Sequence, residues 1–231
     1  MKKILYILFV LLIFLPDLGA QRRNGLIGRR NGTSGSLVAT VGPSFCLGDP
    51  TASIFKETFK IGVHNYDISV GFRHWFPNNL GYKGTFTYAN YAGSDKPNSR
   101  GTAPLSFVSN YYEASIRAEY AIMFGSRYGY IAPSAVYGFI GGAYLNSSVT
   151  FPQYEKDGVM INSFQGNPSN SGFAIPFGLG YLFKYDTNLS IGAEFMIKYS
   201  LTDFVDGYSP KTSDFNDLIY GVSFTIGYTI F

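Results

Sequence analysis

The sequence has only one cysteine, Cys46, among its 231 residues. A single cysteine excludes a disulfide within the chain and a cysteine-ligated metal site. Charge is also scarce, at 14% of residues, where about 25% is usual in soluble proteins. The net charge is only +3 and the basic residues are dispersed. This pattern does not suggest nucleic acid as a partner, because nucleic-acid binding needs a concentrated basic surface.

Long hydrophobic runs are absent except at the N-terminus. Two lysines follow Met1, and Ile4 to Leu15 is apolar except for Tyr6. A basic start, an apolar core and a small residue at Ala20 predict a cleaved signal peptide over residues 1–20. The run is too short for a spanning helix, which needs roughly 20 apolar residues. We therefore expect an exported mature chain that begins at Gln21 and crosses no membrane with a helix.

Aromatic residues and glycine are abundant, with 19 Tyr, 21 Phe and 27 Gly. Between Tyr111 and Met123 the even-numbered residues are apolar, whereas Glu113, Arg117 and Glu119 lie among the odd-numbered ones. A period of two is typical of a β-strand whose two faces meet different surroundings. A strand of a soluble sandwich would give the same alternation, so the rest of the chain has to decide between them.

Similar alternation predicts eight strands, and the connections between them are in turn long and short. The short ones are 77–79, 125–129 and 184–188, which fits a barrel with short periplasmic turns and long external loops. We therefore predict an all-β, eight-stranded antiparallel transmembrane β-barrel in the outer membrane, with both termini in the periplasm and the barrel domain over residues 36–231. The predicted strands are 36–46, 66–76, 80–91, 105–123, 130–145, 172–183, 189–201 and 217–231.

The fifth predicted strand has the least regular pattern. Pro133 and the glycines Gly138, Gly141 and Gly142 interrupt it, which predicts a bulge or a kink. The connection after it, residues 146–171, is expected to be the longest loop of the protein.

Seven charged residues fall on the polar side of their strands. A basic residue that faces lipid at mid-depth costs about 2–4 kcal/mol, so these side chains should point into the lumen. An eight-stranded barrel is only wide enough for its interior to be filled by side chains. We expect opposite charges to pair there, for example Arg117 with Glu113 or Glu119, and to close the lumen. The predicted network comprises Arg73, Lys83, Glu113, Arg117, Glu119, Glu194 and Lys198.

Residues 21–35 form a polar segment with two Arg-Arg pairs, which we interpret as a basic periplasmic arm. A solvated tail is the simpler interpretation, because chain termini are often disordered. The alternative is contact with an acidic partner, through Arg22, Arg23, Arg29, Arg30 and Arg127 of a short turn.

Residues for catalysis, cofactor binding or metal binding are not evident. His64 and His74 lie near opposite ends of one predicted strand, without a nucleophile motif nearby. We therefore expect no enzyme activity and no cofactor.

Several short motifs follow one another along nearly the whole mature chain. They are Leu47-Gly48-Asp49, Ser94-Asp95, Leu105-Ser106-Phe107 with Glu113 and Glu119, the segment 174–181 (AIPFGLGY), and the segment 202–206 (TDFVD). In this order they resemble the PorG-like outer-membrane barrels of Bacteroidota, which are associated with the type IX secretion system. The resemblance implies a non-enzymatic barrel that docks a lipoprotein ring of the secretion machine on its periplasmic side.

Two functions follow as expectations. The first is a structural barrel that anchors periplasmic partners of the secretion system and contacts outer-membrane lipid. The second is a narrow channel or carrier of small molecules, similar to OmpW-type barrels. An outer-membrane enzyme would need a group of catalytic residues at one rim, and the sequence contains no such group.

Overall fold

The computed structural model describes residues 33–47, 65–94, 106–124, 134–151, 153–156, 159–162, 169–185, 188–201 and 217–230. Regular structure in these ranges consists of ten β-strands. Within the same ranges, no helix has the length and apolarity needed to cross a membrane. Eight strands form the barrel: β1 (Ser34–Leu47), β2 (Tyr66–Trp75), β3 (Leu80–Ser94), β4 (Ser106–Phe124), β5 (Ser134–Thr150), β8 (Ser169–Lys184), β9 (Leu189–Ser200) and β10 (Leu218–Thr229).

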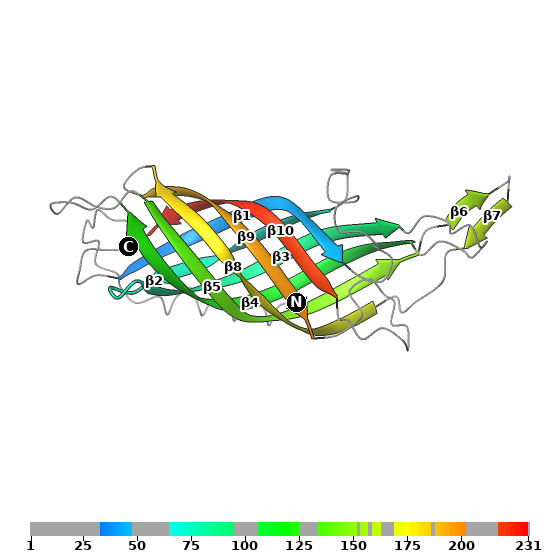
Figure 1. The fold of residues 1–231 in the computed structure, drawn as a ribbon, viewed down its shortest axis with the longest axis horizontal. Coiled ribbons are helices and arrows are strands. Elements are labelled where there is room, and N and C mark those ends of the chain that lie inside the picture. Colours follow the sequence, from blue (N-terminus) through cyan, green and yellow to red (C-terminus); the bar gives the residue numbers. More distant parts are fainter. Residues whose placement is uncertain are drawn as a thin grey trace, which may run out of the picture.

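The eight strands close into a single antiparallel barrel in the order β1-β10-β9-β8-β5-β4-β3-β2 (Figure 1). Closure comes from β1 and β10, which pair from Ser36 opposite Thr229 to Leu47 opposite Leu218. Following the register once round the barrel from Ser36 leads back to β1 at Cys46, ten residues further along. Such a stagger requires strongly tilted strands. The predicted eight-stranded antiparallel barrel is confirmed.

Around β5, the expected long loop and the expected bulge are both wrong. Residues 146–171 are not one loop, because β5 continues to Thr150 and β8 begins at Ser169. Between them, β6 (Gln153–Lys156) pairs with β7 (Val159–Asn162) as a separate hairpin beyond the barrel (Figure 1). No bulge interrupts β5 either, because its register stays constant along β4 and along β8. Glycine here relieves crowding: a Cβ at Gly141 would lie 2.2 Å from a backbone oxygen of β4.

The strand ends that the short connections join lie together at one end of the barrel, with the start of β1 and the end of β10 (Figure 1). The turn at 77–79 is a tight one, and Asn79 has a positive φ of 65°, which asparagine tolerates better than most residues. We call this end the turn end and the opposite one the loop end. β1 begins at Ser34, two residues before the predicted start.

The outer face of the barrel is apolar and ringed by tyrosines. Large exposed side chains alternate with buried ones along the strands; Phe86, for example, is 69% exposed. Outward tyrosines stand eight residues apart at Tyr112 and Tyr120 of β4, and at Tyr220 and Tyr228 of β10. At about 3.3 Å per residue and a tilt of about 40°, this spacing corresponds to roughly 20 Å along the barrel axis. Outer-membrane barrels have an apolar band of about 25 Å between two aromatic girdles.

Two apolar clusters fill the interior on either side of its polar middle. Trp75, Tyr137 and Phe139 dominate the turn-end cluster, which also contains Ala121, Ala135, Leu182 and Met196. The loop-end cluster includes Tyr91, Phe107, Tyr111, Leu145, Val149 and Ile219. Among the described residues, apolar side chains therefore fill the interior on both sides of its polar middle.

We predict that Gly180→Ala destabilises the barrel by about 1–3 kcal/mol, as overpacking usually does. A Cβ at this buried position would lie 2.2 Å from Cζ of Tyr137, whose ring has little room to shift inside the turn-end cluster. The measurement is urea unfolding in lipid vesicles, followed by the gel-mobility difference between folded and unfolded barrel. Gly138→Ala is the matched control, because its Cβ would meet Leu179 only at an ordinary 3.7 Å. Equal stability of the two variants would contradict the prediction.

Candidate functional site

The charges inside the barrel form two groups, and the larger is centred on the carboxylate of Glu194. One oxygen of Glu194 lies 2.7 Å from Arg73 Nη2 and 3.0 Å from Lys83 Nζ. Its other oxygen lies 2.5 Å from Arg117 Nη2. Glu119 pairs with the same two arginines, at 2.8 Å from Arg73 Nε and 3.0 Å from Arg117 Nε. In this Glu194 group three cations share two carboxylates, and every side chain is at most 5% exposed.

Aromatic side chains hold the Glu194 group from the turn end. The Tyr137 hydroxyl donates to Glu194 at 2.5 Å and accepts from Arg73 at 2.9 Å. The Arg117 guanidinium lies 4.0 Å from the centroid of the Phe139 ring, and that of Arg73 lies 4.8 Å from the Tyr137 ring. Cation–π contacts of this kind contribute about 2 kcal/mol when desolvated. The charges and the turn-end cluster thus form one packed unit.

The second group contains Lys198, Glu113 and Asp67 and lies toward the loop end. Lys198 Nζ lies 2.6 Å from Glu113 Oε2, and the Tyr111 hydroxyl donates to the same oxygen at 2.8 Å. Asp67 accepts a hydrogen bond of 3.2 Å from Ser223. This Lys198 group has one cation and two carboxylates, the opposite imbalance to that of the Glu194 group.

A small polar cavity lies between the two groups. Its volume is about 20 Å³, which is room for about one water molecule rather than for a solute. Members of both charge groups line it together with hydroxyl side chains, and Thr85 and Ser115 hydrogen-bond to each other at 2.6 Å. The hydroxyl residues are Thr40, Ser69, Thr85, Thr87, Ser115 and Ser223.

The charges of the two groups balance, with four cations and four carboxylates, and one further carboxylate, Asp217, is buried directly before the start of β10. Burying an isolated ion costs several kcal/mol, and pairing offsets that cost only when partners are close and hydrogen-bonded. An ion crossing the barrel would have to separate these pairs and also pass two packed clusters. The geometry therefore corresponds to a closed lumen.

The sequence-predicted residues fall in two classes. All seven charges expected in the lumen lie inside the barrel, and Arg117 pairs with Glu119 rather than with Glu113. The five arginines proposed as periplasmic contacts lie outside the described residues. They are Arg22, Arg23, Arg29, Arg30 and Arg127.

Asp67, Tyr137 and Tyr111 take part in the two charge groups but were not in the network predicted from the sequence. Asp67 is 2% exposed and lies on the same face of β2 as Arg73, so the parity of its strand could have identified it. Tyr137 and Tyr111 also lie on the inward side, but tyrosine is common on both faces of a membrane barrel. No sequence signal separates an interior tyrosine from one in the aromatic girdle.

Metal ligands do not gather in the part of the chain that the structure describes: no group of three or more His, Cys, Asp or Glu could hold a metal ion there. The His74 ring packs among other rings at the turn end, 5.3 Å from that of Tyr82 and 4.9 Å from that of Phe76. His64 lies outside the described ranges.

Residues 6–231 match the family model of a domain of unknown function, DUF6089. The chain belongs to the DUF6089 family. No curated protein sequence matches this DUF6089 chain significantly.

Among solved structures, the DUF6089 barrel is similar to Neisserial surface protein A, with 14% identity, a TM-score of 0.50, and coverage of 86% of this chain and 99% of that one. Ail, the attachment invasion locus protein of Yersinia pestis, gives 14% identity, a TM-score of 0.46, and 87% and 99% coverage. OprG of Pseudomonas aeruginosa gives 14% identity, a TM-score of 0.42, and 90% and 97% coverage. At such low identity these similarities concern the fold alone, which is that of small outer-membrane β-barrels.

We predict that Glu194→Gln lowers the free energy of unfolding by about 3–5 kcal/mol, the usual effect of breaking a buried pair. The change leaves three cations against Glu119 alone. Lys83→Met removes one of those cations, so the double variant should lose less than the sum of the two single losses, by about 0.5–3 kcal/mol. Urea unfolding of the four proteins in vesicles measures this coupling. Strictly additive losses would mean that the Glu194 group does not act as one unit.

Proposed function

We propose that this chain is a non-enzymatic outer-membrane β-barrel that anchors periplasmic lipoprotein partners of the type IX secretion system. The proposal depends above all on one observation, the interior that is filled by apolar clusters and paired charges. A barrel without a passage contributes through its outer surface and its two rims. Anchoring is a function that such surfaces can perform.

The outer face supports a location in the membrane. Large apolar side chains such as Phe86, Ile116 and Phe224 are at least 64% exposed, and in water a face with so many exposed apolar side chains would cause aggregation. In a bilayer the same side chains meet hydrocarbon. The predicted signal peptide, residues 1–20, agrees with export to the outer membrane.

The turn end is the better candidate for partner contacts. The predicted arm, residues 21–35, overlaps the first two residues of β1, and β1 begins at this end. Short turns at the same end fit the periplasmic side of an outer-membrane barrel. The resemblance to PorG-like barrels supplies the class of partner, a periplasmic ring lipoprotein. Four arginines of the arm and Arg127 would supply charge complementary to an acidic surface of that partner.

An OmpW-like channel is the alternative function, and conductance separates it from the anchor. We predict no steady conductance when the purified protein is reconstituted in a planar bilayer, because the paired charges and both apolar clusters block the barrel. An open porin reconstituted in the same way controls for insertion. Reproducible conductance steps from the wild-type protein would favour the channel and contradict the anchor proposal.

We predict that replacing the four arm arginines by glutamine reduces recovery of secretion-system lipoproteins in a pull-down from cells of the native host. The affected residues are Arg22, Arg23, Arg29 and Arg30. Ionic contacts at an exposed surface weaken with salt, so raising the ionic strength should reduce wild-type recovery as well.

The matched control removes four basic residues from the long connections at the other end of the barrel, by the changes K56Q, K60Q, K96Q and R100Q. Recovery in the control should equal that of the wild type. Unchanged recovery in the arm variant, or an equal loss in the control, would contradict the proposed contact.

A further inference from the structure

The lipid-facing surface carries a depression across β3, β4, β5 and the neighbouring β8. Two adjoining hollows of about 450 and 720 Å³ share Phe86, Ala114 and Tyr144 as walls and floor. We call them together the lipid-face groove. Ligand sites typically measure about 300–1,000 Å³, so the groove is large enough to order one flexible molecule.

Small residues on three strands create the groove. Ala114 stands between Phe86 and Tyr144 in the cross-strand register, and Gly84 and Gly142 flank Ile116 in the next row. Packing within the barrel does not require these glycines. A Cβ at Gly142 would meet nothing within 4 Å, and one at Gly84 only a backbone oxygen at 3.9 Å. The inward Gly141 and Gly180, in contrast, have no room for a Cβ.

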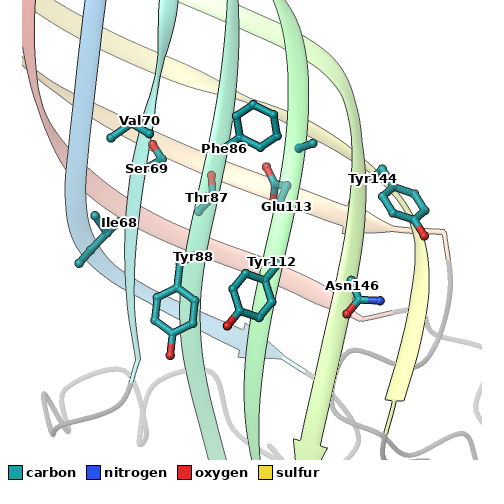
Figure 2. A pocket seen from close by; sticks show the side chains of 11 residues that line it. Ile68, Ser69, Val70, Phe86, Thr87, Tyr88, Tyr112, Glu113, Tyr144 and Asn146 are labelled. Carbon is teal, nitrogen blue, oxygen red and sulfur yellow. The ribbon is translucent and has the colours of Figure 1, made fainter. Parts of the chain in front are cut away.

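Polar tips gather at the loop end of the groove. Figure 2 shows the rings of Tyr88 and Tyr112 side by side, with their hydroxyls toward the loop end and Asn146 beside them. The two rings lie 5.3 Å apart, and the Tyr88 hydroxyl donates to Asn110 at 3.0 Å. The second hollow is lined mainly by apolar side chains, from Phe86 and Ile116 across to Leu201 beside the loop end of β9. The groove therefore joins a polar, aromatic rim on β3, β4 and β5 to an apolar lining that includes deeper side chains such as Ile116.

We propose that the lipid-face groove binds an acyl chain of an outer-leaflet lipid, with the head group at the tyrosine and asparagine rim. This inference rests on the proposed location in the outer membrane. A hollow left empty against the bilayer would forfeit dispersion contacts along its whole lining. A lipid chain is present at that depth, is apolar along its length, and has its polar group where the rim lies.

A second copy of this chain fits the groove less well. A symmetric dimer places the same patch on both partners, so two hollows would face each other and leave a void. Association inside a bilayer depends on close packing, because lipid removes the hydrophobic driving force between protein surfaces.

The test uses the full-length protein in vesicles of phosphatidylethanolamine and phosphatidylglycerol that contain a phospholipid with a photoreactive diazirine in its acyl chain. Cross-linked residues are mapped by mass spectrometry. The expected result is enrichment at Phe86, Ile116 and Tyr144 above the rest of the apolar outer face. Uniform labelling around the barrel would overturn the proposal.

Gly142→Leu should fill the groove and reduce labelling there to the level of the rest of the outer face. Gly138→Leu, on the same face of β5 but outside the groove, is the matched control and should keep the wild-type pattern. Ala114→Leu fills the groove from β4 and serves as a second variant, with heat-modifiable gel mobility confirming that each barrel is folded. Enrichment that survives both filling changes would overturn the proposal.

If the wild-type protein forms a dimer that Gly142→Leu abolishes, the lipid proposal would also be overturned, and the groove would instead be a contact between two copies of this chain. The vesicle assay is independent of the partner and of the cellular location. Its failure is therefore distinguishable from failure of the proposed function, which the pull-down and the conductance recording measure.

Discussion

The structure depends on pairing the charges inside a barrel whose interior is filled by side chains and therefore has little room for water. Glu194 is the centre of this arrangement, because three cations and a tyrosine hydroxyl converge on its two oxygens. A carboxylate in this position is tolerable only with such partners, and the same applies to each cation around it. The Glu194 and Lys198 groups carry opposite excess charge and lie on either side of one small cavity. Neither group alone would be neutral, so the two halves of the interior depend on each other.

Close packing makes this electrostatic arrangement possible. Tyr137 reaches both Glu194 and Arg73 because Gly180 leaves space for its ring on the neighbouring strand. The inward glycines therefore contribute to the charge network without having any side chain of their own. Outward glycines have a different consequence. Gly84 and Gly142 leave the lipid face hollow. The same residue type therefore makes room for packed side chains inside the barrel and leaves a depression on its outside.

Because the interior is filled, the outer face and the two rims are the surfaces on which other molecules can be contacted. The Glu194 group and the turn-end cluster fill the interior next to the rim at which β1 begins. The loop end is built differently, since β4 and β5 extend to 19 and 17 residues and a separate hairpin lies beyond them. One rim is short and the other is elaborate, which is consistent with contacts of different kinds on the two sides of a membrane.

Alternation along eight strands, together with the long and short connections between them, was enough to predict the barrel. The alternation within each strand also predicted the side on which its charges lie. In β4, Glu113, Arg117 and Glu119 share one parity, and a period of two specifies a face regardless of what the neighbouring strands contain. The seven charges could therefore be assigned to one face from the alternation alone. The length of the fifth strand was misjudged, because polar residues such as Asn146 and Ser148 continue β5 where the pattern suggests a loop.

The sequence alone could not predict which charged side chains pair with each other inside the barrel. The strand parity allowed Arg117 to pair with either Glu113 or Glu119. In the structure it pairs with Glu119 and Glu194, because the cross-strand register and the length of its side chain bring these carboxylates within contact. Tyr137 and the lipid-face groove likewise depend on residues from strands far apart in the chain. The sequence by itself determined which face each side chain takes, because a face is a local property of one strand. Only the tertiary structure decided which charges meet and where the surface is hollow, because both depend on distances between strands.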